Sequence, residues 1–194
     1  MTHNDLLAAL APIADALDAL GVRFYVGGSV ASSTHGAARS SLDVDVVVNL
    51  EPHHVDPLVA ALGDRYYVPV GRLRSAVAAR SSCNVIHLAT MFKVDLFVAK
   101  GRPFDCAADA RARATPLDDS PGARRFPVSS PEDVVLAKLE WFRRGGETSE
   151  RQWWDVLTVL QVTPAIDRAY MTRWAAELAV ADLLSRALHD AGLG

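Results

Sequence analysis

The stretch from Tyr25 to Val48, YVGGSVASSTHGAARSSLDVDVVV, carries the most informative pattern in this sequence. A short apolar run ends at Gly27-Gly28-Ser29, and a valine-rich run containing Asp43 and Asp45 follows it. Both runs favour β-strands, and Ser29 is a good N-cap for a short helix between them. The stretch therefore predicts a strand–helix–strand unit at the start of an α/β fold.

Three carboxylates stand on predicted strands where apolar residues are expected. Asp43 and Asp45 are two residues apart, so both point to one face of their strand, and Asp95 lies within KVDLFV, residues 93–98. Like charges on one face repel unless a cation lies between them, and Mg²⁺ prefers carboxylate oxygens. The alternatives are a solvent-facing D-x-D pair on an edge strand or turn and, for Asp95, an ordinary acid at a hairpin.

Gly27-Gly28-Ser29 offers backbone N–H groups and a hydroxyl without side-chain bulk, which is the chemistry of an anion site. The sequence lacks the GxxxxGK[ST] and GxGxxG patterns, so neither a P-loop nor a dinucleotide-binding fold is indicated. A phosphate site beside metal-binding carboxylates is what phosphoryl transfer from a nucleotide requires.

The remaining pattern divides the chain into a mixed part, residues 1–130, and a helical part, residues 131–194. The stretch 115–130 is rich in proline and is expected to be a loop or linker, and Ser130-Pro131-Glu132-Asp133 is a helix start. Strands are expected at 22–26, 42–49, 66–70 and, as a hairpin, at 84–89 and 93–99, and helices at 6–20, 29–35, 52–62, 73–79, 131–144, 149–161 and 164–190.

Composition and charge exclude several further classes of protein. The 194 residues are 50% hydrophobic and 22% charged with a net charge of −3, which excludes a strongly basic nucleic-acid-binding protein. Two cysteines, Cys83 and Cys106, cannot form a disulfide framework or a zinc ribbon. No cationic leader and no apolar run of about 20 residues is present, so we expect a cytoplasmic protein, not bound to a membrane and monomeric.

Residues 25–48 resemble the signature of the nucleotidyltransferase superfamily that has the DNA polymerase β palm: an apolar residue, G-[GS], a spacer, then D-h-[DE]-h, with a third acid on a later strand. Asp95 matches the third acid. The segment PEDVVLAKLEWFRRGGETSERQWWDV, residues 131–156, is similar to the segment after the palm in AbiEii-like toxin nucleotidyltransferases. The resemblance covers residues 22–49, 84–100 and 127–160, and it implies a palm with a mixed sheet flanked by helices, followed by a helical subdomain.

The resemblance also implies roles for individual residues. Asp43, Asp45 and Asp95 would be catalytic and would bind two Mg²⁺ ions, for which Mn²⁺ could substitute. The expected nucleotide-binding residues are Gly28, Ser29, Arg39, Lys138 and Asp155. The implied reaction moves NMP from an NTP to an acceptor hydroxyl and releases pyrophosphate. In the toxin-like form the acceptor is tRNA or another macromolecule, and a cognate antitoxin restrains the enzyme.

Several alternatives stay open at this point. Arg39 could be a solvated loop residue and Lys138 a solvated helix residue. Lys93 could pair with Asp95, contact phosphate or be an exposed strand residue, and Asp155 could hold Lys138, contact the nucleotide or be an ordinary acid on a helix surface. The acceptor could be a small hydroxyl compound, as in aminoglycoside nucleotidyltransferases, although the run of arginines within 65–80 favours an RNA end. The chain could also be a non-catalytic module that binds a nucleotide or a partner.

Overall fold

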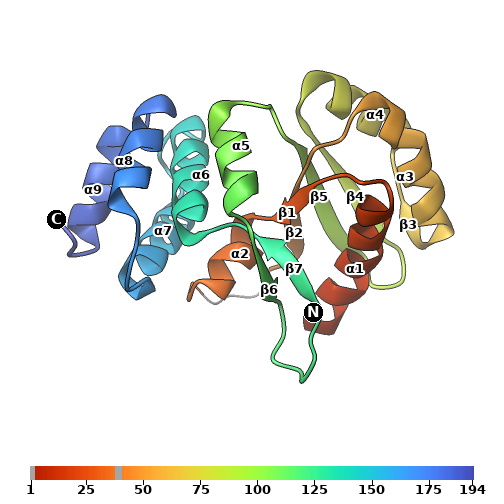
Figure 1. The fold of residues 1–194 in the computed structure, drawn as a ribbon, viewed down its shortest axis with the longest axis horizontal. Helices are drawn as coiled ribbons and strands as arrows, with labels where there is room; N and C mark the ends of the chain where they lie inside the picture. The colour runs from red at the N-terminus through yellow and green to blue at the C-terminus, as the bar shows by residue number, and fades with distance from the viewer. Residues whose placement is uncertain (1–2, 38–40) are drawn as a thin grey trace. The chain divides into compact units, whose positions relative to one another are not determined.

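The computed structural model describes residues 3–37 and 41–194, which form two compact units. The first unit comprises Met1–Val30 and Ser40–Val128, and the second comprises Ala31–Arg39 and Ser129–Gly194. Each unit is described by itself below, and Figure 1 shows the elements of both.

The first unit is built on a mixed sheet, which has seven strands in the described part of the chain, in the order β3-β4-β5-β2-β1-β7-β6. Strand β2 runs parallel to β5 and β1 runs parallel to β7, whereas the other neighbours are antiparallel. The strands are β1 (Phe24–Val26), β2 (Asp43–Val48), β3 (Tyr66–Tyr67), β4 (Ser82–His87), β5 (Phe92–Val98), β6 (Arg113–Pro116) and β7 (Arg125–Val128).

One face of the central strands forms the core of this unit. Val44, Val46 and Val48 of β2 are buried, whereas Asp43 and Asp45 are partly exposed, and β4 and β5 alternate in the same way. Helices α1 and α4 contact this sheet, and α3 packs against both helices. The alternation therefore separates a covered apolar face from an open face that carries the charged residues.

Helices account for most of the rest of the first unit. Helix α1 buries Leu10, Ile13 and Leu17 completely, as expected for an amphipathic helix with one apolar face. The helical elements are α1 (His3–Ala19), η1 (Pro52–His54), α3 (Val55–Leu62), η2 (Gly63–Arg65), α4 (Val70–Ala79) and α5 (Pro103–Arg111), with α2 (Gly28–Thr34) starting in this unit.

The expected hairpin is confirmed, because β4 and β5 pair in antiparallel register. The prediction of a loop over 115–130 is wrong in part, because its ends belong to the antiparallel pair β6–β7, which Figure 1 shows as a hairpin with a long connection. Helix α5 was not predicted at all. It begins with Pro103, and the Asp105 carboxylate accepts a hydrogen bond from the Arg102 backbone N–H at 3.0 Å.

The second unit is helical after residue 130, as predicted, with α6 (Pro131–Arg144), α7 (Glu150–Val162), α8 (Arg168–Glu177) and α9 (Ala181–Asp190). Ser130 and Ser149 cap α6 and α7 through side-chain hydrogen bonds from backbone N–H groups. The single helix predicted over 164–190 is wrong. Asp167 caps a new helix, and Ala179, with φ 56°, separates α8 from α9.

Two acids of the first turn of α6 are buried and hydrogen-bonded within this unit. The Glu132 carboxylate accepts from the Asp167 backbone N–H at 3.0 Å. Asp133 accepts from the hydroxyls of Ser130 and Tyr170, each at 2.6 Å. These bonds join the start of α6 to the start of α8, so both acids have structural partners.

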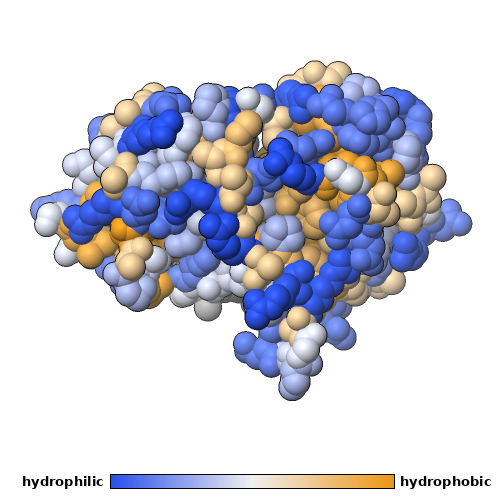
Figure 2. All heavy atoms as spheres, in the orientation of Figure 1, coloured by the Kyte–Doolittle hydropathy of each residue, from blue (hydrophilic) through white to orange (hydrophobic). Residues whose placement is uncertain are grey.

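Figure 2 shows hydrophilic side chains over much of one face, with hydrophobic side chains gathered into smaller areas. Among the described residues, no helix is both long enough and apolar enough to cross a membrane.

The hydroxyl of Tyr66 makes the core sensitive to alkaline pH. It is buried and donates a 2.8 Å hydrogen bond to the Ala9 carbonyl of α1, and burial raises the pKa of Tyr66 to about 12. Above the ordinary tyrosine pKa of about 10, the unfolded chain loses this proton before the folded chain does. The free energy of unfolding therefore falls by up to about 1.4 kcal/mol per pH unit between pH 10 and pH 12.

Tyr66→Phe should remove this alkaline loss and cost about 1 kcal/mol at neutral pH through the lost hydrogen bond. Urea unfolding of both proteins between about pH 8 and about pH 11 measures the two effects. An equal alkaline slope in the variant would contradict the assignment.

Candidate functional site

The three predicted carboxylates lie on the open face of the sheet, at one end of two parallel strands. Asp45 of β2 is in register with Asp95 of β5, and Asp43 is in register with Lys93. The strand β1 ends beside them, because the Gly27 N–H donates to the Asp45 carbonyl at 2.9 Å. The prediction that Asp43 and Asp45 share a face is confirmed.

Lys93 forms ion pairs with two of these acids. Its Nζ lies 3.3 Å from Asp43 Oδ2 and 2.9 Å from Asp95 Oδ2, so the ammonium group stands between the two carboxylates. The hydrogen bond to Asp95 is the largest cause that raises the pKa of Lys93 above its ordinary value. Of the alternatives left open for Lys93, the structure shows the pair with Asp95 and adds Asp43 as a second partner.

Two further polar residues complete the group. Asn84 of β4 donates from Nδ2 to Asp95 Oδ1 at 2.7 Å, and Ser41 donates from its hydroxyl to Asp43 Oδ1 at 3.0 Å. Asp95 is the more enclosed of the two acids, with 15% of its side chain exposed against 36% for Asp43. Asn84 and Ser41 were not predicted. Alternation places Asn84 on the open face, but only the register of the hairpin shows that it meets Asp95.

Gly28 packs closely against the side chain of Asp45, which restricts the residue type at this position. Its φ is +56°, and a Cβ built on it would lie 1.6 Å from Asp45 Oδ2. Only glycine fits at this position, because any other side chain would displace the carboxylate. The helix α2 begins at Gly28, so Ser29 lies within its first turn, and the prediction that Ser29 is the N-cap is wrong by two residues, because Gly27 precedes the helix.

The other predicted nucleotide-binding residues lie outside the described part of the first unit. Arg39 lies outside the described residues. Lys138 of α6 and Asp155 of α7 belong to the second unit, where Lys138 Nζ lies 2.7 Å from Asp155 Oδ2 and both side chains are buried. Asp155 thus holds Lys138, which was one of the alternatives, and because both side chains are buried neither is a solvated surface residue. A nucleotide contact of either residue stays a prediction.

The donor atoms of the carboxylate group suit a hard divalent cation, because Asp43, Asp45 and Asp95 present only oxygen ligands. In residues 3–37 and 41–194, however, no three His, Cys, Asp or Glu side chains converge closely enough to form a ready-made metal site. The ammonium of Lys93 stands between two of these carboxylates, Asp43 and Asp95. The residues fit a metal ion in their chemistry, and we expect an ion bound between Asp43 and Asp95 to displace Lys93.

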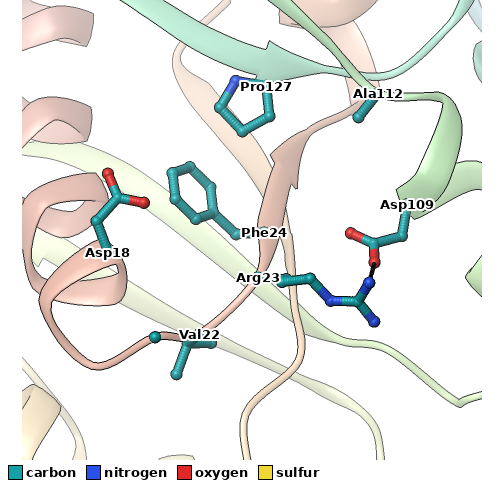
Figure 3. Close-up of a pocket in the computed structure, with 8 residues that line it drawn as sticks. Asp18, Val22, Arg23, Phe24, Asp109, Ala112 and Pro127 are labelled. Carbon is teal, nitrogen blue, oxygen red and sulfur yellow. Dashed lines mark ion pairs between the residues drawn. The ribbon is translucent and has the colours of Figure 1, made fainter.

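A surface cavity of about 420 Å³ lies elsewhere in the first unit, at the start of β1. Its wall includes Asp18, Phe24, Pro127 and the ion pair between Arg23 and Asp109, at 3.0 Å (Figure 3). Gly28 and Asp45 lie at the other end of β1, so this cavity is separate from the carboxylates.

Several arginines that favoured an RNA acceptor are engaged in ion pairs. Arg74 pairs with Asp56, and Arg80 lies 2.6 Å from Glu51. These contacts neutralise part of the basic run within 65–80. The charge of this segment therefore gives less support to an RNA-binding face than the sequence indicated.

Comparison with solved structures identifies the fold. The chain is similar to an antigenic nucleotidyltransferase-like protein from Paracoccidioides brasiliensis, with a TM-score of 0.59, 17% identity, and coverage of 97% of this chain and 92% of that one. It is also similar to the antibiotic-resistance factor ANT(2'')-Ia, with a TM-score of 0.52, 11% identity, and coverage of 95% and 94%. No protein-family model and no curated protein matches. The mixed α/β fold is thus nucleotidyltransferase-like, as predicted.

Gly28→Ala should disturb the carboxylates through the contact with Asp45. We expect it to lower the free energy of unfolding by at least about 2 kcal/mol, because it combines a left-handed backbone with a clash. Gly27→Ala is the matched control, since its Cβ would meet its nearest atom, Val47 Cγ2, at 4.0 Å. It should cost less than about 1 kcal/mol. Equal losses in urea unfolding would contradict this role of Gly28.

The buried pair in the second unit gives another test. Lys138→Met leaves the buried Asp155 carboxylate without its ammonium partner and should cost about 3–5 kcal/mol. Replacing both, with Lys138→Met and Asp155→Leu, should restore most of that loss, because no charge is then buried. Thermal and urea unfolding measure both proteins, and a double variant no more stable than the single one would show that the charges do not act as a pair.

Proposed function

We propose that this chain is a metal-dependent nucleotidyltransferase that moves NMP from an NTP to an acceptor hydroxyl. The observation that carries the proposal is the register of Asp45 with Asp95 on parallel strands, with Gly28 packed against the Asp45 carboxylate. Asp43 and Asp45 lie on β2, the last strand of the strand–helix–strand unit, and Asp95 lies on the neighbouring strand β5. Three carboxylates on one sheet face are the arrangement that metal-assisted phosphoryl transfer uses.

In this proposal Asp43, Asp45 and Asp95 hold Mg²⁺, with two ions per site and Mn²⁺ as a substitute. The bound ions would neutralise the charge that develops on the triphosphate. Gly28 and Ser29 begin α2, and Gly28 packs against the Asp45 carboxylate. Their backbone N–H groups would approach the phosphates. The acceptor oxygen forms a bond to the α-phosphorus, the bond from that phosphorus to pyrophosphate breaks, and Asp95 accepts the hydroxyl proton.

The resemblance to AbiEii-like toxins supports a macromolecular acceptor, tRNA or another macromolecule, and a protein antitoxin that restrains the activity. A small hydroxyl compound is the second candidate. It is favoured by the similarity of this fold to that of an antibiotic-resistance factor. A non-catalytic module would have the same fold without transfer.

Transfer is tested directly with α-³²P-labelled NTPs, Mg²⁺, and total bacterial RNA, bacterial protein or an aminoglycoside as acceptor. The wild-type protein should label one acceptor class, and Asp45→Asn should reduce labelling by at least about 100-fold, because the metal loses a charged ligand. Asp119→Asn, an exposed acid in the β6–β7 connection, is the control and should keep full activity. Equal labelling by the wild-type protein and Asp45→Asn would contradict the assignment.

Removal of the ammonium group between the acids should strengthen metal binding. Lys93→Met eliminates two partly exposed ion pairs worth up to about 1 kcal/mol each, so the Kd for Mn²⁺ should fall by roughly 3- to 10-fold. Isothermal titration calorimetry measures this without any turnover. Lys100→Met, which removes an exposed charge just beyond β5, should leave the Kd unchanged. An unchanged or weaker Kd in Lys93→Met would contradict competition between Lys93 and the metal.

A further inference from the structure

The open face beside the carboxylates carries exposed apolar side chains. Exposed large hydrophobic residues in the described part of the first unit are Leu42, Tyr67, Leu88 and Met91, with exposed fractions of 69%, 56%, 46% and 65%. We call Tyr67, Leu88 and Met91, together with the partly exposed Ile86, the apolar strip. A contiguous exposed apolar patch on a protein surface commonly marks an interaction site.

Strand register places the apolar strip next to the carboxylates. Tyr67 of β3 pairs with Ile86 of β4, Ile86 pairs with Lys93 of β5, and Lys93 pairs with Asp43 of β2. This row crosses four neighbouring strands, about 14 Å at the usual strand spacing. Leu88 and Met91 belong to the turn that joins β4 to β5.

Alternation shows that the row lies on the open face. Tyr66, the neighbour of Tyr67, is buried and bonds to α1 on the covered face, so Tyr67 faces the other way. Asn84, two residues before Ile86, reaches Asp95. The row and the carboxylates therefore share one surface, and a molecule that reaches Asp95 from the side of β3 and β4 passes over Tyr67 and Ile86.

From this surface we infer that the acceptor is a polypeptide, whose Ser, Thr or Tyr hydroxyl receives the NMP. The inference rests on the proposed function, and it names the class of acceptor. The hydroxyl oxygen forms a bond to the α-phosphorus, pyrophosphate leaves, and the proton passes to Asp95, so the step needs no other reactant.

The charges of the surface favour a polypeptide over a nucleic acid. The row contains one cation, Lys93, and it lies among three carboxylates, Asp43, Asp45 and Asp95. A phosphate backbone is bound by clusters of cations, and a surface on which acids outnumber cations repels it. A row of Tyr, Ile, Leu and Met instead has the composition of a protein–protein contact.

A small polycationic acceptor fits the surface less well. Such a molecule would be recognised by carboxylates, which lie at one end of the row only, and it would leave Tyr67, Leu88 and Met91 without a role. A peptide chain can cover the whole row, because about four extended residues span 14 Å.

The test uses the full chain with α-³²P-labelled NTPs and Mg²⁺. Three acceptors are offered in parallel: dephosphorylated casein together with soluble bacterial protein, total bacterial RNA, and kanamycin. The variants are Tyr67→Ser and Met91→Asn, the latter chosen because Asn tolerates the left-handed backbone of Met91, with φ 55°. Trp141→Ser removes an exposed apolar side chain of the second unit and is the control.

We expect label in protein that survives ribonuclease and is lost on protease treatment. Tyr67→Ser and Met91→Asn should each reduce it at least about tenfold, whereas Trp141→Ser should not. Binding of Mn²⁺ and of a non-hydrolysable NTP, measured by calorimetry, should change by less than about twofold in the strip variants, which shows that the fold and the carboxylates are intact.

Label in RNA or in kanamycin would overturn the inference, and so would protein labelling that the strip variants leave unchanged. Absence of label in every acceptor, with the wild-type protein and all NTPs, would instead count against the proposed function itself. The two failures are therefore distinguishable.

Discussion

The parallel pairing of β2 with β5 is the constraint on which the candidate site depends. It sets Asp45 level with Asp95 and Asp43 level with Lys93, so three negative charges and one positive charge share a small area of one sheet face. Three acids without a counter-charge would repel each other, because neighbouring strands are only about 4.8 Å apart. The ammonium of Lys93 offsets that repulsion, and a divalent cation could do the same with one more unit of charge.

The same alternation gives the two faces of the sheet different tasks. Valines on the covered face pack under α1 and stabilise the sheet that carries the site. The open face carries the candidate site, where Gly28, just after β1, packs against the Asp45 carboxylate. Exposed apolar residues on the strands beyond Lys93 extend this face, so the residues that would perform the reaction and those that would select the acceptor are placed by one strand register.

Sequence alone was enough to predict the central strands and the common face of Asp43 and Asp45, because residues of a strand alternate between its two faces. The Gly27-Gly28-Ser29 segment marked the end of the strand before them. It could not predict Asn84 as a partner of Asp95, since that contact depends on hairpin register. Helix α5 is short and no prediction covered its residues, whereas the prolines within 115–130 disfavour strands and led to the prediction of a loop where β6 and β7 lie. The break between α8 and α9 falls at Ala179, and it could not be predicted because neither glycine nor proline occurs there.

Crystals grown with Mn²⁺ and a non-hydrolysable NTP would test the central claim most directly, through the anomalous scattering of manganese. The account predicts manganese peaks bounded by Asp43, Asp45 and Asp95, with the Lys93 ammonium moved away from the position between Asp43 and Asp95 that it holds without metal. A nucleotide bound elsewhere, or no manganese at these carboxylates while Lys93 still joins Asp43 to Asp95, would contradict it.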